Sequence, residues 1–296
     1  MKLCLGTVQF GLDYGIQGKP KPKKDKIFEM LDYAMDSGIC TLDTASAYGD
    51  AEVILGDYLS GNKSKIKRLE VVSKLKPDAF RAEPKRKWGD IAVRNAHKSL
   101  DILGIECFSA YLFHDASCIF DDQAVAALEE VKKAGLAERI GVSIYTPKEA
   151  IKALEYSSIT AVQVPYNVFD HRLDREEFFE RAKEQGTAIF ARSPLLQGLL
   201  MMDPDRLPEK VAFAAGELRD YLRICEKFGI KPLDAALGYV WRRDDIDYMV
   251  FGVDNIKQLR EYMSFRDTRI PLDMIKELTE RYKEADERLV NPVLWK

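Results

Sequence analysis

Short apolar runs alternate with helical patterns along this chain, and the alternation repeats eight times. The runs fall at residues 2–5, 40–42, 69–73, 107–113, 140–142, 160–164, 187–191 and 248–251. Short, continuously apolar strands that alternate with amphipathic helices are typical of a parallel sheet covered by helices. Eight such units are the number that closes a barrel. The sequence therefore predicts an α/β fold, a single (β/α)8 TIM barrel that forms one domain over residues 1–296.

Helical patterns separate the apolar runs. They lie at residues 27–34, 51–59, 91–103, 124–133 and 174–184, and Pro147 opens another helix. Two helical stretches, 209–228 and 232–241, precede the eighth run, so the last crossover is enlarged, and helices from Ile256 and Leu272 end the chain. An open doubly wound sheet is the alternative, but no Gly-x-Gly-x-x-Gly turn follows the first run, which removes that fold's strongest signature.

Composition narrows the class of protein. Hydrophobic residues make up 46% of the chain and charged residues 31%, which is typical of a soluble protein with a large core. The net charge of −3 argues against nucleic-acid binding, and we expect the Lys-rich segments KPKPKKDK and KSKIKR to be solvated loops. No apolar run reaches 18 residues and the first residues do not resemble a signal peptide. We therefore expect a cytoplasmic protein without a membrane partner.

The five cysteines are widely spaced. No CxxC pair is present, and no histidine lies near a cysteine at the spacing of metal ligands. We therefore expect reduced, mostly buried thiols and no metal site.

Four residues with ionisable side chains follow or end neighbouring apolar runs. Asp43 and Tyr48 follow the second run, Lys74 closes the third, and His114 closes the fourth. Each has an ordinary explanation on its own, such as a helix cap, a solvated lysine or a core histidine. Because the carboxyl ends of barrel strands share one face, all four are expected at one rim, where such a cluster indicates a functional site.

This cluster suits the reduction of a carbonyl group. Hydride addition requires a proton for the developing alkoxide, and a phenol with a pKa near 10 is a reluctant donor at neutral pH. Lys74 is expected to lower the pKa of Tyr48, while Asp43 holds Lys74 by charge pairing. His114 would orient the carbonyl and stabilise its charge. Tyr48 is then the general acid.

The motifs DTASAYGDAE, VVSK and LFH, in this order on a barrel, resemble the aldo-keto reductase superfamily. LGTVQFG, IGVS, VQVPYN and SPLLQGLL extend the resemblance, which covers residues 5–261. It implies NAD(P)H-dependent reduction of a small aldehyde or ketone, sugar-like carbonyls included, with Asp43, Tyr48, Lys74 and His114 as catalytic residues. It also implies that the cofactor contacts Gly6, Thr7, Ser143, Gln163, Arg192, Ser193, Leu195, Gln197, Gly252, Asp254, Gln258 and Glu261.

The sequence departs from the family at three points of this implied site. Ile144 stands where many members have Asn, and Arg192 where many stack a Tyr on the nicotinamide. At the positions where NADP-using relatives hold the 2′-phosphate, this chain has Gly252, Val253, Asp254 and Gln258. Lys257 is the only cation expected nearby. NADH is therefore expected to bind at least as well as NADPH.

Two other functions are compatible with such a barrel. A Schiff-base aldolase would use Lys74, but that chemistry needs an uncharged lysine and Asp43 favours the charged form. A cofactor-binding regulatory subunit without turnover is the second alternative, since some members of the superfamily serve as channel partners. The ordered tetrad of Asp43, Tyr48, Lys74 and His114 favours an enzyme over both.

Overall fold

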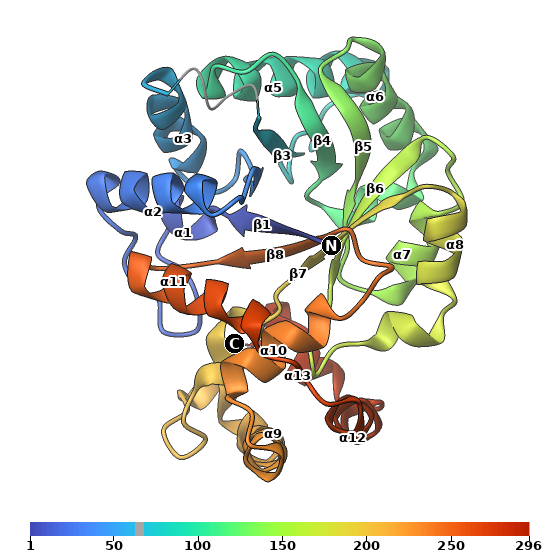
Figure 1. The fold of residues 1–296 in the computed structure, drawn as a ribbon. Helices are drawn as coiled ribbons and strands as arrows, with labels where there is room; N and C mark the ends of the chain where they lie inside the picture. The colour runs from blue at the N-terminus through green and yellow to red at the C-terminus, as the bar shows by residue number, and fades with distance from the viewer. Residues whose placement is uncertain (63–67, 296) are drawn as a thin grey trace.

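The computed structural model describes residues 1–62 and 68–295. Eight parallel strands pair in chain order and close into a barrel, with β8 paired to β1 (Figure 1). The strands are β1 Lys2–Gly6, β2 Thr41–Asp43, β3 Glu70–Leu75, β4 Phe108–Phe113, β5 Ala137–Ser143, β6 Ile159–Pro165, β7 Ala188–Arg192 and β8 Tyr248–Gly252. Each expected apolar run overlaps one of these strands, and the predicted (β/α)8 barrel is confirmed.

Helices surround the ring of strands (Figure 1). The main ones are α2 Lys24–Asp36, α3 Ala51–Ser60, α5 Trp88–Leu103, α6 Asp122–Lys133, α7 Pro147–Ala153, α8 Phe178–Glu184, α9 Ala215–Phe228, α10 Pro232–Trp241, α11 Ile256–Ser264 and α12 Leu272–Tyr282. Local chemistry sets several of their ends. At the start of α7, Thr146 and Glu149 form a capping box. Gly104 ends α5 in the left-handed conformation, with φ 66°.

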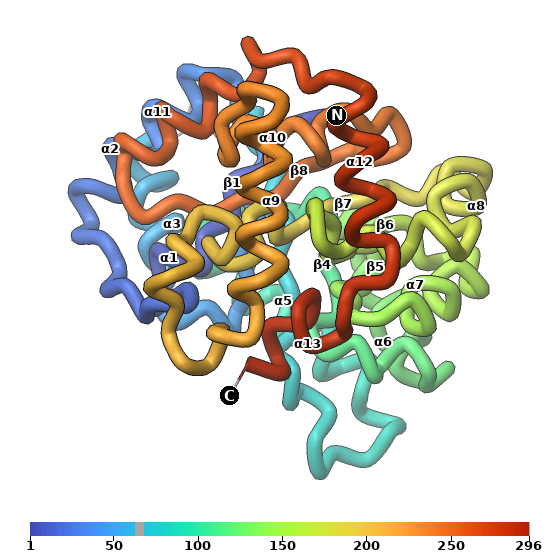
Figure 2. Tube along the Cα trace, turned by 90° about the horizontal axis from the view of Figure 1, so that it is seen from below, coloured from blue at the N-terminus to red at the C-terminus, as the bar shows by residue number. Residues whose placement is uncertain are grey.

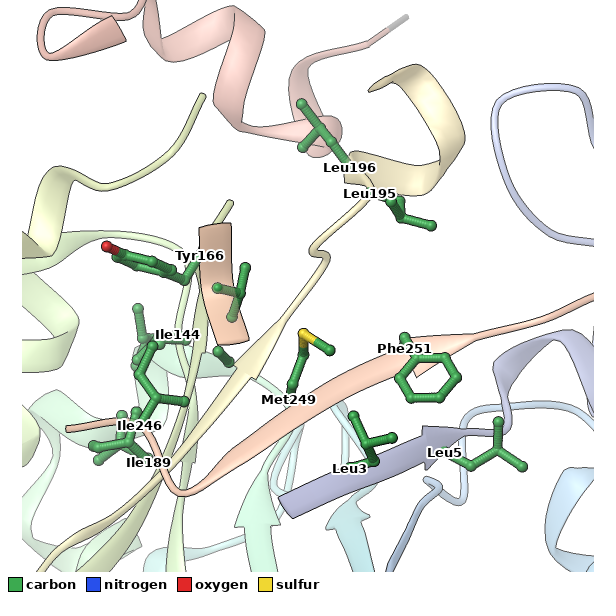
Figure 3. Close-up of a cluster of buried hydrophobic side chains, with 14 of the residues drawn as sticks. Leu3, Leu5, Ile144, Tyr166, Ile189, Leu195, Leu196, Ile246, Met249 and Phe251 are labelled. Atoms are coloured by element: carbon green, nitrogen blue, oxygen red, sulfur yellow. The ribbon is translucent and has the colours of Figure 1, made fainter. Parts of the chain in front are cut away.

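Alternating side chains of the strands form two apolar layers. Cys4 of β1 and Val250 of β8 belong to a cluster inside the barrel. Their neighbours Leu5 and Phe251 belong to the larger cluster between strands and helices, part of which is drawn in Figure 3. Because side chains of a strand point to opposite faces in turn, one continuous apolar run supplies both layers. The barrel is therefore a packed scaffold for the loops at its rim.

The enlarged last crossover is also confirmed. It contains α9 and α10, and α9 packs beside the C-terminal helix α12 (Figure 2). Arg281 of α12 forms an ion pair with Asp220 of α9, and the Tyr282 hydroxyl donates to the Glu217 carbonyl at 2.9 Å. These contacts fasten the end of the chain to the crossover.

Several helix boundaries differ from the sequence-based prediction. The helix expected at residues 174–184 is divided into a 3₁₀ turn, Arg172–Arg175, and α8, because Glu177 has a left-handed φ of 52°. The stretch 209–228 begins as a 3₁₀ helix, Glu209–Ala214, before α9. Two four-residue helices, α1 Val8–Gly11 and α13 Glu287–Val290, were not predicted. A periodic pattern does not report such short or strained turns.

Other expectations can be compared with the described residues. Within residues 1–62 and 68–295, no helix is long and apolar enough to cross a membrane. All five cysteines are free thiols, but the expectation that they are mostly buried is wrong, since only Cys4 and Cys225 are buried and Cys107 is exposed. Apart from Arg68, the KSKIKR segment lies outside the described residues.

Candidate active site

The carboxyl ends of the strands surround a cavity of about 670 Å³. This volume is ordinary for a cofactor or small-molecule site. Of the residues expected at the site, the cavity is lined by Gly6, Thr7, Asp43, Tyr48, His114, Ser143, Gln163, Arg192, Ser193, Leu195, Gln197, Gly252, Asp254 and Gln258. Residues far apart in sequence meet here because a closed parallel barrel brings all its strand ends to one face.

Lys74 lies within β3 and is completely buried. Its Nζ donates to Oδ1 of Asp43 at 2.7 Å and to the carbonyl of Thr44 at 2.9 Å. Burial alone would lower the pKa of Lys74, but the Asp43 carboxylate and the Tyr48 phenol raise that pKa above its usual value. The lysine is therefore an ammonium held at a fixed point.

Asp43 connects this ion pair to two further strands. The Oδ1 atom of Asp43 also accepts from Nε2 of Gln163 at 2.7 Å, and Oε1 of Gln163 accepts from the Ser143 hydroxyl at 3.0 Å. All four side chains are buried. The resulting chain of hydrogen bonds runs from β3 through β2 and β6 to β5, and it fixes the amide of Gln163 at the cavity wall.

Tyr48 lies between β2 and α3, and the Lys74 Nζ atom is 4.9 Å from its ring centroid. Burial raises the pKa of Tyr48, and this effect exceeds the lowering caused by the Lys74 ammonium. The expectation of a lowered pKa is therefore wrong as a net result. A strand-end position in the sequence does not reveal how thoroughly water is excluded from the phenol. At neutral pH Tyr48 is protonated, which is the form that a proton donor requires.

His114 directly follows β4 and lines the cavity beside Tyr48. The two rings meet edge to face, with centroids 5.6 Å apart and an interplanar angle of 89°. Burial, reinforced by the Lys74 ammonium, lowers the pKa of His114 to about 4. Its Nδ1 atom is buried and has no hydrogen-bond partner among the described residues. The imidazole is thus neutral at pH 7 and able to donate one hydrogen bond to a ligand.

Two glycines position the loop that carries Tyr48. A Cβ on Gly11, in α1, would lie 1.8 Å from the Tyr48 carbonyl oxygen and 2.6 Å from the Ala51 nitrogen. Gly49 has a φ of 56°, and a Cβ there would lie 2.3 Å from the Gly11 carbonyl oxygen. The loops after β1 and β2 therefore approach each other at a distance that only glycine permits.

The Gly11→Ala substitution should displace the Tyr48 loop. We expect a loss of stability of about 1 to 3 kcal/mol, as for overpacked interiors, together with reduced catalytic turnover. Gly216→Ala is the matched control, because a Cβ on this α9 residue meets no atom of the described chain within 4 Å. Urea unfolding and turnover assays of both variants measure the difference. Equal stability and turnover in the two variants would contradict this role for Gly11.

Arg192 ends β7 and projects into the cavity. One of its Nη2 hydrogens is donated to the Ile144 carbonyl at 2.8 Å, and its guanidinium lies 4.6 Å from the centroid of the Tyr145 ring. Ile144 stands where many members of the similar family have Asn. Its backbone carbonyl accepts this hydrogen bond from Arg192. Beyond Arg192, the backbone turns through left-handed conformations at Ser193 and Gln197, with φ 61° and 54°. These turns curve the loop around the cavity.

The far end of the cavity lies beside the end of β8. Gly252 has no side chain to displace the amide of Gln9, whose Oε1 would be 2.2 Å from a Cβ there. Val253 is buried in the core and does not line the cavity. Asp254 lines it, with its backbone N–H donating to Oε1 of Gln258 at 2.7 Å.

The charged residues at this end of the cavity differ from those expected from the sequence. Glu261 and Lys257 are exposed on α11 and do not line the cavity. Lys19, from the loop after β1, does line it, and its Nζ lies 3.0 Å from Oδ2 of Asp254. The expectation that Lys257 is the only nearby cation is therefore wrong. The sequence separates Lys19 from Asp254 by most of the chain, but β1 and β8 are adjacent in the barrel.

Several residues of the cavity wall were not predicted. They include Gln9, Tyr14, Lys19, Tyr145 and Tyr262. Tyr262 could have been found, because it follows Gln258 by four residues and so lies on the same face of α11. Gln9 lies in the four-residue helix α1 and the other three residues lie on loops, so none belongs to a periodic pattern that distinguishes it in a single sequence.

Comparison with known proteins establishes the family of this chain. The model of the Aldo/keto reductase family matches residues 2–283. The chain belongs to this family. Its members are oxidoreductases that use nicotinamide cofactors.

Individual relatives of this aldo/keto reductase are distant. The uncharacterized oxidoreductase YqkF of Bacillus subtilis is 25% identical over 262 residues, which cover 83% of this chain and 84% of YqkF. Aldo-keto reductase str7 of Strobilurus tenacellus is 27% identical over 260 residues, covering 80% of this chain and 75% of str7. The crystal structure of the thermostable aldo-keto reductase Tm1743 superposes with a TM-score of 0.69 at 24% identity, over 94% of each chain. That likeness concerns the fold alone.

Proposed function

We propose that this aldo/keto reductase reduces an aldehyde or ketone to an alcohol by hydride transfer from NAD(P)H, with Tyr48 as the general acid. The observation that carries the proposal is that Tyr48, His114 and Asp43 line one cavity, while the buried Lys74 pairs with Asp43 and lies next to the Tyr48 ring. A protonated phenol and a neutral imidazole are suited to donate hydrogen bonds to one carbonyl oxygen.

The cavity has features that fit a nicotinamide cofactor. The Gln9 Oε1 atom is buried beside Gly252 without a hydrogen-bond partner in the described chain, so it can accept from a ligand hydroxyl. Ser143 and Gln163 would hold the carboxamide, and the loop from Ser193 to Gln197 would hold the diphosphate, as the family resemblance implies. When bound, the cofactor supplies the hydride that adds to the carbonyl carbon.

The residues of the chain would supply the proton and the charge stabilisation. Tyr48 would donate its phenolic proton to the carbonyl oxygen as negative charge develops there. The Lys74 ammonium, held by Asp43, would stabilise the phenolate that remains. His114 would donate a hydrogen bond to the same oxygen, an interaction that is worth about 2.7 to 4 kcal/mol for an oxyanion-hole donor. In the reverse direction the Tyr48 phenolate would act as the base.

The alternative functions are supported less well. A Schiff-base lysine must lose its proton to attack a carbonyl, whereas the environment of Lys74 raises its pKa and leaves the amine fully buried. A regulatory subunit would bind the cofactor without turnover. In such a protein the tetrad of Asp43, Tyr48, Lys74 and His114 would have no evident use.

We further propose that NADH binds at least as well as NADPH. Asp254 lines the cavity at a position where NADP-using relatives supply basic or hydroxyl groups. A carboxylate near a 2′-phosphate would repel it by about 1 kcal/mol or more at a partly shielded distance. The cation Lys19 is already paired with this carboxylate.

One set of measurements tests both proposals. Fluorescence titration of the wild-type protein with NADH and NADPH, at low and high salt, should show NADH affinity equal to or above that for NADPH. Turnover should then appear in a panel of aldehydes and ketones. An NADPH affinity far above that for NADH, and collapsing with salt, would overturn the cofactor preference. Cofactor binding without turnover of any carbonyl in the panel would favour the regulatory alternative.

A further inference from the structure

Lys19 and Asp254 form an ion pair at the outer end of the cavity. The distance from Lys19 Nζ to Asp254 Oδ2 is 3.0 Å, and both side chains are partly exposed, at 48% and 23%. The two residues follow β1 and β8, which pair directly in the barrel. Their meeting is therefore a consequence of barrel closure.

The local backbone fixes where Lys19 stands. Tyr14 and Lys19 form an antiparallel bridge with two backbone hydrogen bonds of 3.1 Å each. The turn between them is completed by a hydrogen bond from the Gly18 N–H to the Gly15 carbonyl at 3.0 Å, and both glycines have positive φ. Tyr14 is partly buried and lines the cavity. The lysine therefore projects from an anchored turn at the cavity edge.

Asp254 is fixed by Gln258. The Gln258 Oε1 atom accepts the Asp254 backbone N–H at 2.7 Å, and Nε2 of Gln258 donates to Asp254 Oδ2 at 3.3 Å. The Gln258 backbone N–H in turn donates to the Asn255 side chain at 2.9 Å. The carboxylate is thus held in place to neutralise Lys19.

We propose that Asp254 determines cofactor choice by masking Lys19, a cation that is otherwise in position to bind a 2′-phosphate. This inference rests on the proposed nicotinamide cofactor. A dianionic phosphate requires cationic partners, and the carboxylate both repels it and occupies the cation. A ribose 2′-hydroxyl has the opposite preference, since a carboxylate accepts its hydrogen bond. The preference for NADH over NADPH then depends on the ion pair between Lys19 and Asp254. Lys19 is therefore a specificity-determining residue.

An exposed ion pair of this kind is readily broken. Solvent-exposed pairs contribute little to stability, because water and salt screen them. Removing the Asp254 charge should therefore release Lys19 without unfolding the loop, and an asparagine retains the shape that Gln258 contacts. The structural alternative is that the pair only fastens two loops together, in which case its loss would affect both cofactors equally.

The test compares the wild-type protein, Asp254→Asn, Lys19→Met and the double variant by fluorescence titration with NADPH and NADH. Asp254→Asn should raise NADPH affinity about tenfold relative to NADH, and the gain should shrink in high salt. In the double variant the part of the gain that Lys19 supplies should disappear, and only the smaller part that comes from the lost repulsion by Asp254 should remain. Lys24→Met is the matched control, because Lys24 pairs with Asp57 on the outer helices and has a similar exposure of 54%. Its ratio of affinities should equal that of the wild type.

Three outcomes would overturn the inference. A gain of the same size in Asp254→Asn and in the double variant would show that Lys19 does not hold the phosphate. Equal weakening of both cofactors in Asp254→Asn would show that the pair is only a fastening. A wild-type preference for NADPH would exclude masking, although the reductase proposal would stand. If the wild type bound neither cofactor, the proposed function would fail as well, so the two failures are distinguishable.

Discussion

Tyr48→Phe should lower the rate of carbonyl reduction by at least about 10²-fold, the usual contribution of general acid catalysis, while cofactor affinity is retained. The substitution removes only the phenolic oxygen. The ring that faces His114 remains, as does the surface beneath the Lys74 ammonium. A loss of turnover at unchanged cofactor affinity would therefore report the missing proton. Steady-state kinetics with a responsive aldehyde and fluorescence titration of the cofactor measure the two quantities.

Tyr14→Phe provides the comparison for this experiment. Tyr14 is another phenol of the same cavity, and burial raises its pKa to about 12. Its hydroxyl makes no hydrogen bond with Lys74 or Asp43 in the described chain, so its loss should reduce turnover much less than that of Tyr48. Near-wild-type turnover in Tyr48→Phe, or an equal loss in Tyr14→Phe, would show that Tyr48 is not the acid.

The strand ends are the part of the site that the sequence predicts well. Asp43, Ser143, Arg192 and Gly252 are the last residues of their strands, and a closed parallel barrel places all such residues on one face. Their approximate meeting therefore follows from the apolar runs alone. The hydrogen bond from Gln163 to Asp43 joins residues 120 positions apart and required the actual barrel geometry.

Contacts between loops and the extent of burial could not be predicted in the same way. Lys19 lies on an irregular loop, and its pairing with Asp254 depends on a turn whose glycines the sequence does not assign to a conformation. The net pKa shift of Tyr48 depends on the balance between its desolvation and the effect of the Lys74 ammonium. Both depend on the three-dimensional structure. Glu177 likewise divides a periodic helix through a backbone angle that no residue type demands.

The second large effect is expected from Lys74→Met. The phenolate left after proton donation would lose its cation, so we expect carbonyl reduction to fall by at least about 10²-fold with cofactor affinity intact. Asp43→Asn should cause a milder loss, because Lys74 keeps its hydrogen bond to the Thr44 carbonyl at 2.9 Å. Turnover and cofactor titration of both variants test these expectations.

Stability separates this catalytic loss from a folding defect. Lys74→Met leaves the Asp43 carboxylate buried, with Gln163 as its remaining side-chain hydrogen-bond donor in the described chain. Removing one partner of a buried ion pair typically destabilises a protein by about 3 to 5 kcal/mol. The double variant Lys74→Met/Asp43→Asn contains neither charge, so its free energy of unfolding should recover much of that loss. Its turnover should nevertheless remain as low as that of Lys74→Met.

Urea unfolding measures the free energy of unfolding of these variants, and steady-state kinetics measures their turnover. If the stability losses of the two single variants simply add in the double variant, the residues do not act as one buried pair. If turnover recovers together with stability, Lys74 serves folding and has no part in the chemistry.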